Sequence, residues 1–252
     1  MQEIDTNGKV IIIDDKRDEV DPLINFFESL NRQCIFIEGL GEIPSDTTVL
    51  NDVDMIFLDL NFGTGVNEGT IRSIIKAIKG QNIEPYLLFI WSKNTHEFQS
   101  IKEAIENDND MKEKKCQPFD IIALDKNNYF NFNSGQVTTK SSFKILINRE
   151  VINKVNKMNG FVFIKKWNQA VKDISEKLIY EIIDTISDQQ SDEEDVIRFL
   201  NSCSRSYWGK MFDSVSKIQK KDGIYPILNK FLYEVLNCEI PELLNGTKFK
   251  VG

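Results

Sequence analysis

Residues 54–60 read DMIFLDL, and residues 9–15 read KVIIIDD. Each stretch contains a short apolar run that aspartate follows directly. Runs of this length that are apolar at nearly every position are typical of strands buried on both faces of a sheet. We therefore predict two strands of a parallel sheet, with Asp14, Asp15 and Asp59 at their carboxyl ends.

Three further apolar runs have the same character, and helical patterns separate most of the runs from one another. The predicted strands are residues 33–37, 85–91 and 119–124, and the predicted helices are residues 19–30, 70–78 and 97–106. A weak pattern over residues 40–50 would fit one more short helix. Alternating strands and helices predict an α/β fold with a doubly wound, five-stranded parallel sheet. Ser92 and Lys126 then lie close to the ends of the fourth and fifth strands.

The second half of the chain has a different pattern. We expect the α/β domain to span residues 1–130, and the Asn-, Ser- and Thr-rich residues 131–143 predict a linker. Residues 144–252 are then a mostly α-helical region, because apolar side chains recur at helical spacing. This region shows no clear helix-turn-helix pattern and no concentrated basic patch, which argues against nucleic-acid binding. We expect an output or dimerisation module, and the sequence leaves a homodimer open.

The amino-acid composition limits the kinds of catalytic and metal site that the chain could form. The single histidine argues against a His-containing catalytic triad, a multi-His metal site and a phosphohistidine helix in this chain. Four scattered cysteines and a polar N-terminus predict a cytoplasmic protein, and no apolar run is long enough to span a membrane. Residues 1–139 contain 13 Lys and Arg against 24 Asp and Glu. This acidic half fits a divalent-cation site, a basic partner or simply a solvated acidic surface.

The polar residues at the strand ends form a coherent set. Aspartates that converge on one crevice repel each other, and Mg²⁺ relieves this because it prefers carboxylate and carbonyl oxygens. A carboxylate beside Mg²⁺ is able to attack phosphorus and form an aspartyl phosphate. Lys126 and Ser92 would then stabilise charge on the phosphoryl oxygens. The set therefore indicates a phosphoryl-acceptor site.

Four motifs carry a family resemblance. They are IIIDD (residues 11–15), FLDL (57–60), WS (91–92) and LDK (124–126). In this order and at strand ends, they resemble the receiver domain of two-component response regulators. The resemblance covers about half the chain, and it implies a flavodoxin-like fold followed by an unfamiliar helical region.

The resemblance also implies a role for each site residue. Asp59 would be the phosphoacceptor, and Ser92 and Lys126 would bind the phosphoryl group. The Mg²⁺ ligands would be the carboxylates of Asp14, Asp15 and Asp59 and the backbone carbonyl of Asn61. Two positions depart from the family. Lys93 follows Ser92 at a position where a small residue is usual, and its side chain would either crowd the phosphoryl group or help to bind it. Ala123 stands at a position where an aromatic residue is frequent.

The function implied is a response regulator that receives its phosphoryl group from a sensor histidine kinase or a kinase-like ATPase. Phosphorylation would switch a protein-interaction surface for an effector that the sequence does not identify. Such a protein is no enzyme beyond slow loss of its own phosphoryl group. The domain combination resembles bacterial signalling modules beside kinase-like ATPases, some of them in stress responses or phage defence.

Two alternatives remain open from the sequence. The first is a phosphate-independent pseudo-receiver that acts as an interaction scaffold, which Lys93 and Ala123 favour. The second is a haloacid-dehalogenase-like phosphatase. Residues 59–64 of this chain weakly resemble the nucleophile loop of such enzymes. Asn61 argues against the phosphatase, because this position would need an aspartate as general acid.

Overall fold

The structure is a computed structural model of the chain. It describes residues 4–38, 42–43, 50–60, 68–79, 84–133 and 136–187, together with 198, 201–202, 205, 209–214, 216 and 230. Asn61, most of the weak pattern over 40–50 and most of the region beyond 187 lie outside the described residues.

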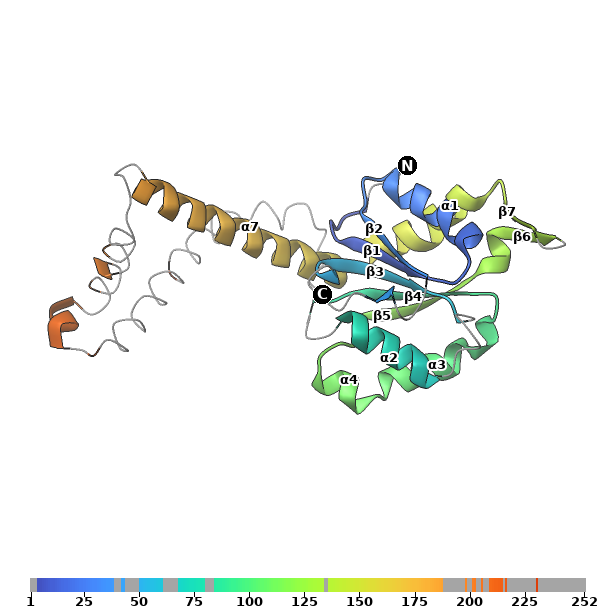
Figure 1. Cartoon of the computed structure of the whole chain (residues 1–252), viewed down its shortest axis with the longest axis horizontal. Coiled ribbons are helices and arrows are strands. Elements are labelled where there is room, and N and C mark those ends of the chain that lie inside the picture. The colour runs from blue at the N-terminus through green and yellow to red at the C-terminus, as the bar shows by residue number, and fades with distance from the viewer. Residues whose placement is uncertain are drawn as a thin grey trace, which may run out of the picture. The chain divides into compact units, whose positions relative to one another are not determined.

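A five-stranded parallel sheet forms the centre of the first half of the chain (Figure 1). Its strands are β1 (Lys9–Ile13), β2 (Cys34–Ile37), β3 (Val53–Leu58), β4 (Leu87–Ser92) and β5 (Asp120–Asp125). They lie in the order β2-β1-β3-β4-β5, and every neighbouring pair is parallel. This order is the doubly wound arrangement that flavodoxin and CheY share. The predicted fold class is confirmed.

Helices cover both faces of this sheet, as Figure 1 shows. They are α1 (Arg17–Glu28), α2 (Glu68–Lys79), α3 (Phe98–Glu106), which the 3₁₀ turn η3 (Thr95–Glu97) precedes, and α4 (Asn109–Glu113). Side chains alternate along each strand, so neighbouring residues enter different cores. Val10 and Ile12 of β1 pack on the α1 side, whereas Ile11 and Ile13 pack on the α2 and α3 side.

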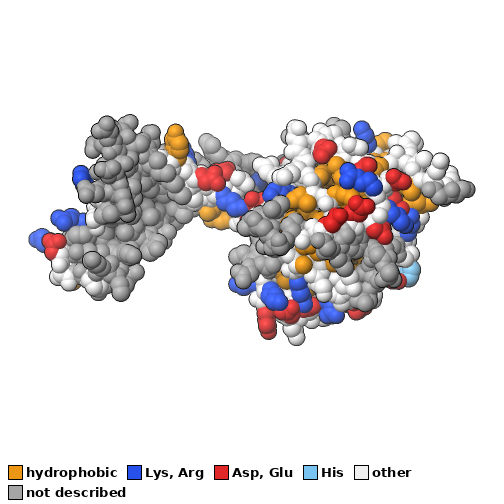
Figure 2. Space-filling view, viewed as in Figure 1, with side chains coloured by type: hydrophobic (Ala, Val, Ile, Leu, Met, Phe, Trp, Pro, Cys, Tyr) orange, Lys and Arg blue, Asp and Glu red, His pale blue; other side chains and the backbone are white. Residues whose placement is uncertain are grey.

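Helix α4 lies between α3 and β5 in the chain. The side chain of Asp108 caps α4 by accepting a hydrogen bond from the Met111 amide at 2.9 Å. Asp110 forms ion pairs with Lys76 at 2.7 Å and with Lys114 at 3.0 Å. Figure 2 shows this mixture of acidic and basic side chains over α4, at the bottom of the view. These exposed pairs give the helix a charged outer surface.

The polar composition of residues 131–143 predicts a linker, but the structure has an ordered hairpin there. A 3₁₀ turn, η4 (Lys126–Asn128), leads from β5 into the antiparallel strands β6 (Phe130–Asn133) and β7 (Gln136–Thr139). The physical reason is alternation: Phe130 enters the main core, and Phe132 and Val137 pack against it, while Asn131 and Asn133 are exposed.

Helices follow the hairpin. They are α5 (Phe143–Ile147), the π-helical segment η5 (Asn148–Ile152), α6 (Asn153–Lys157) and α7 (Asn159–Ser187). The first three elements form one continuous helical stretch on the α1 side of the sheet, because residues of all three belong to its core. The first compact unit therefore extends to Lys165, well beyond the predicted boundary at residue 130.

The second compact unit comprises residues 166–252. Its described part contains the remainder of α7 and the 3₁₀ segment η6 (Gly209–Ser214). The prediction of a helical region is confirmed for this part. Within the described residues, no helix is both long and apolar enough to cross a membrane.

Candidate functional site

Three aspartates meet at the carboxyl ends of β1 and β3. Asp14 and Asp15 follow β1, and Asp59 follows β3 and donates its amide hydrogen to the carbonyl of Ile13 at 2.9 Å. One carboxylate oxygen from each of the three aspartates lies within 4.8 Å of the others. Asp14 and Asp59 are buried, whereas Asp15 is exposed. The predicted acidic residues are thus brought together as one cluster.

Lys126 enters this cluster from the end of β5. Its ammonium lies 2.6 Å from Oδ2 of Asp14 and 3.1 Å from Oδ2 of Asp59, and its side chain is buried. A third carboxylate, that of Glu19 on α1, lies 2.7 Å away. Three carboxylates thus surround one ammonium group. Lys126 therefore lies where a phosphoryl group on Asp59 would need a cation.

Burial and charge shift the pKa values of these groups. Burial raises the pKa of Asp14 to about 6, against the attraction of Lys126, and the nearby Asp59 adds to the rise. For Lys126, burial alone would lower the pKa, but Asp14 and Asp59 outweigh burial and the pKa is raised. The lysine therefore stays charged, while Asp14 holds its negative charge only with difficulty. A further positive charge would therefore stabilise the ionised carboxylates of the cluster.

Glu19 is a site residue that the sequence analysis missed. It lies in the first turn of α1 with a side chain that is 1% exposed, and its second oxygen, Oε1, pairs with Lys93 at 2.8 Å. Burial would raise the pKa of Glu19, but hydrogen bonds from Lys126 and Lys93 outweigh burial and lower it. A signal was present, since Glu19 shares the helical face of Leu23 and Phe26 and so points inward.

Lys93 has a second contact besides Glu19. Its ammonium lies 3.5 Å from the centre of the Phe132 ring in β6, which is a cation–π contact. The hairpin thus reaches the edge of the acidic cluster through this lysine. The departure from the family at position 93 therefore has a definite structural role, since Lys93 joins α1 to the hairpin.

The remaining predicted site residues have different outcomes. Ser92 is buried at the end of β4, in register with Asp125, and its hydroxyl oxygen accepts a hydrogen bond from the Asn94 amide at 3.1 Å. It therefore lies at the same edge of the sheet as the acidic cluster. Asn61 lies outside the described residues, and its backbone carbonyl as a metal ligand stays a prediction.

The acidic cluster fits a magnesium ion chemically. Its donors are carboxylate oxygens, which suit Mg²⁺, and exposed Asp15 leaves one side open to the water ligands that Mg²⁺ retains. The raised pKa of Asp14 gives independent support, because a buried carboxylate with too little positive charge around it is stabilised by a cation. Asp14, Asp15 and Asp59 are the described residues that would hold the ion.

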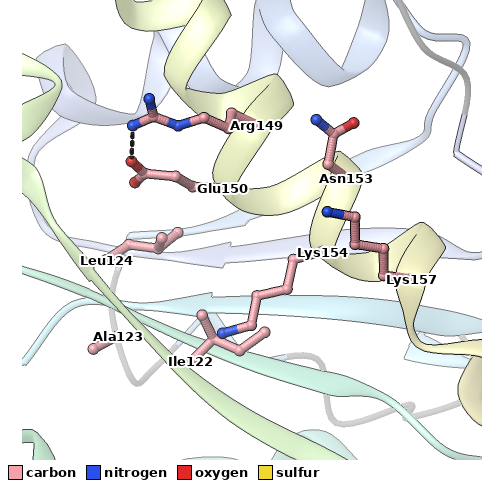
Figure 3. A pocket seen from close by; sticks show the side chains of 8 residues that line it. All are labelled: Ile122, Ala123, Leu124, Arg149, Glu150, Asn153, Lys154 and Lys157. Carbon is pink, nitrogen blue, oxygen red and sulfur yellow. Dashed lines mark hydrogen bonds and ion pairs between the residues drawn. The ribbon is translucent and has the colours of Figure 1, made fainter.

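A cavity of about 380 Å³ lies between β5 and the helical stretch η5–α6 (Figure 3). Its lining residues are Ile122, Ala123, Leu124, Arg149, Glu150, Asn153, Lys154 and Lys157. Figure 3 shows Arg149 directed to Glu150, with which it forms an ion pair at 2.8 Å. Ala123 is the position where receiver domains often have an aromatic, and here its small side chain lines open space.

No protein-family model matches the chain, and no curated protein is similar to it. Among solved structures, the chain is similar to a response regulator receiver domain protein from Clostridium thermocellum, at 14% identity over 60% of this chain and 99% of that one, with a TM-score of 0.33. Full-length FixJ from B. japonicum is similar at 11% identity over 93% of this chain and 97% of that one, with a TM-score of 0.38.

The strand order decides the fold type. Residues 9–125 have the receiver fold. The predicted flavodoxin-like fold is thus confirmed, and the chemistry of the site is a separate question.

Proposed function

We propose that the chain is a response regulator in which Asp59 accepts a phosphoryl group in a Mg²⁺-dependent reaction. One observation carries the proposal: the Lys126 ammonium lies between Asp14 and Asp59, beside the exposed Asp15, at the carboxyl ends of the strands. In doubly wound sheets, ligands bind at this edge. No buried apolar pocket for a substrate is needed, because the phosphoryl group would sit at the rim.

Each residue has a definite role in the proposed reaction. A carboxylate oxygen of Asp59 forms the new bond to phosphorus as the bond to the donor breaks. Mg²⁺, when bound by Asp14, Asp15 and Asp59, supplies positive charge to the phosphoryl oxygens. Lys126 holds Asp59 in place and then pairs with a phosphoryl oxygen, and Ser92 donates a hydrogen bond to another. The added charge biases an interaction surface between two states.

The wider biological role is also part of the proposal. The donor would be a sensor histidine kinase or a kinase-like ATPase, and the helical residues beyond 165 would serve as output or homodimerisation region. Beyond slow loss of the phosphoryl group, no enzymatic activity is proposed. We place the protein in the bacterial cytoplasm, where the free thiols of Cys34 and Cys116 would persist. A stress or phage-defence system is the proposed setting.

The test is native mass spectrometry of the full chain with Mg²⁺ and beryllofluoride, a noncovalent phosphoryl mimic, and in parallel with acetyl phosphate. We expect one adduct per chain that requires Mg²⁺ and is absent in Asp59→Ala. Asp110→Ala is the matched control, because Asp110 is an aspartate in an ion-paired cluster on α4, at a distance from the site in sequence and fold. This control should form the adduct as the unaltered chain does.

One alternative has an observation in its favour. Three carboxylates, one of them that of Glu19, already lie within 3.1 Å of the Lys126 ammonium, so a phosphoryl group must compete with them for the lysine. A pseudo-receiver would retain this arrangement permanently as an interaction scaffold. If the chain forms no adduct with either mimic or with co-encoded kinases, the pseudo-receiver is the better account.

A further inference from the structure

Two lysines and one glutamate form a bridge that leads away from the acidic cluster. Glu19 forms an ion pair with Lys126 at 2.7 Å and accepts a hydrogen bond from Lys93 at 2.8 Å, and its side chain is almost fully buried. Lys93 in turn lies over the ring of Phe132, 3.5 Å from its centre. The bridge therefore connects Lys126, which contacts Asp59, to the β6–β7 hairpin in three contacts.

The hairpin is held differently at its base and along its strands. At the base, Phe130 is buried in the core against Trp91, and the Lys140 amide donates to the carbonyl of Tyr129 at 2.9 Å. Further along, Phe132 is only partly buried, and its polar neighbours Asn131 and Asn133 are exposed. Beyond the fixed base, the Lys93 contact adds to the packing of Phe132 on Phe130 and the core.

We propose that the β6–β7 hairpin reports the state of Asp59, and that Lys93 transmits this state from Glu19 to Phe132. This inference rests on the proposed function, because it requires a phosphoryl group on Asp59. It adds the element of this chain that responds. Ala123 leaves the usual aromatic position on β5 without a ring. Transmission of the phosphorylation state through the hairpin would therefore replace transmission through an aromatic side chain at that position.

Electrostatics gives the direction of the response. A phosphoryl group places about two negative charges beside Lys126 and Ser92. Lys126 turns toward it, so Glu19 loses one of its two cations and is repelled by the new charge. Lys93, which directly follows Ser92, is then drawn from Glu19 toward the phosphoryl oxygens. Phe132 loses the cation over its ring, and the outer part of the hairpin loosens.

Hydrogen exchange of the full chain tests this inference. Exchange of residues 130–139 is measured with Mg²⁺ alone and with Mg²⁺ and beryllofluoride, and native mass spectrometry checks the adduct. We expect exchange in the hairpin to rise by about 2- to 30-fold with the adduct, the factor that corresponds to the loss of one cation–π contact. In Phe132→Leu, exchange should be fast in both states while the adduct still forms.

Two further variants separate the relay from simple damage to the hairpin. Phe132→Tyr keeps an aromatic face and should retain the rise. Val137→Ala, altered at the residue paired with Phe132 in β7, removes apolar contact but leaves the ring, so it should also respond. An adduct without any change in the hairpin, or a normal response in Phe132→Leu, would overturn the relay and leave Asp59 as acceptor. Failure of the unaltered chain to form the adduct would overturn both proposals.

Discussion

Strand β3 has a buried aspartate near each end, and the two have opposite surroundings. Asp54 lies near the start of β3 among cations: Lys165 is 2.9 Å from its Oδ1, and Arg32 is 3.5 Å from its Oδ2. Asp59 follows the end of β3 among other carboxylates, and Lys126 is shared by three of them. One sheet thus holds a carboxylate with two cations at one end and an excess of carboxylates at the other.

The cluster of Asp54, Arg32 and Lys165 at the amino end of β3 has the features of a structural joint, a point where several chain segments are held together. Oδ2 of Asp54 accepts a hydrogen bond from the Gly8 amide at 2.6 Å, so three chain segments converge on one side chain. Gly8 is required here, because a Cβ atom at this position would lie 2.3 Å from Oδ1 of Asp54. Arg32 also donates to the carbonyl of Gly8 at 3.1 Å. These resident groups satisfy the charge of Asp54.

The contrast between Asp54 and Asp59 shows how the number of nearby cations separates a structural carboxylate from one in a binding site. A carboxylate with enough resident cations contributes to stability, and its loss leaves buried cations uncompensated. A cluster with too few cations attracts an exchangeable one, and it keeps a high pKa until that cation binds. By this criterion the carboxyl end of β3 is the end that we propose binds the cation.

The largest expected effect is on stability, at the amino end. Asp54→Ala should lower the free energy of unfolding by about 3–5 kcal/mol, because Arg32 and Lys165 would stay buried without their counter-charge. Asp59→Ala should cost much less, because Lys126 keeps Asp14 and Glu19. Urea unfolding without Mg²⁺ measures both. Equal losses for the two variants would contradict the distinction between joint and site.

Next in size is the effect of the ion itself. Mg²⁺ at about 100 times its dissociation constant should raise the free energy of unfolding by about 2.7 kcal/mol, because it binds only the folded cluster. Asp15→Asn should remove most of this gain, whereas Asp110→Asn on α4 should keep it. The measurement is urea unfolding with and without Mg²⁺. A gain that survives in Asp15→Asn would place the ion elsewhere.

The third effect concerns pH and the Asp14 carboxyl. Its folded pKa of about 6 lies above the ordinary value of 3.8, so its contribution to stability is present at low pH and is lost as pH rises through about 6. Mg²⁺ needs the ionised form, so the proton competes with it. Below pH 6, Mg²⁺ affinity should fall about tenfold per pH unit, as calorimetric titration would show. An affinity that is constant from pH 5 to 7 would refute this account.

The sheet and the acidic cluster were predictable from the sequence for one physical reason. Strands buried on both faces have continuous apolar runs, and parallel strands bring their carboxyl ends to one edge. The residues that follow Ile13 and Leu58 were therefore certain to meet once the order of the strands was right. The observed strand ends lie within two residues of the predicted ones, so Asp59 keeps its place at the rim.

Glu19 and the hairpin were harder, because their roles depend on distant partners. An acidic residue in the first turn of a helix is equally explained by the helix dipole. The helical face places Glu19 inward, but only Lys93 and Lys126 show which charges it meets there. Residues 131–143 are polar in composition, but the few apolar residues that alternate there determine the hairpin more than the mean polarity of the segment does. Asp54 was hidden in the same way, since Arg32 and Lys165 are remote in sequence.

The smallest expected effect comes from charges that are not buried. Arg17 and Asp21 form an ion pair at 2.5 Å on α1, with side chains 58% and 48% exposed, close in sequence to Glu19. Asp21→Asn should change the free energy of unfolding by less than about 0.5 kcal/mol, because water and salt screen an exposed pair. Urea unfolding at low and high salt, beside Glu19→Gln, measures the contrast. If Asp21→Asn costs as much as Glu19→Gln, then distance between charges, and not burial, determines their contribution, and the two ends of β3 would differ for another reason.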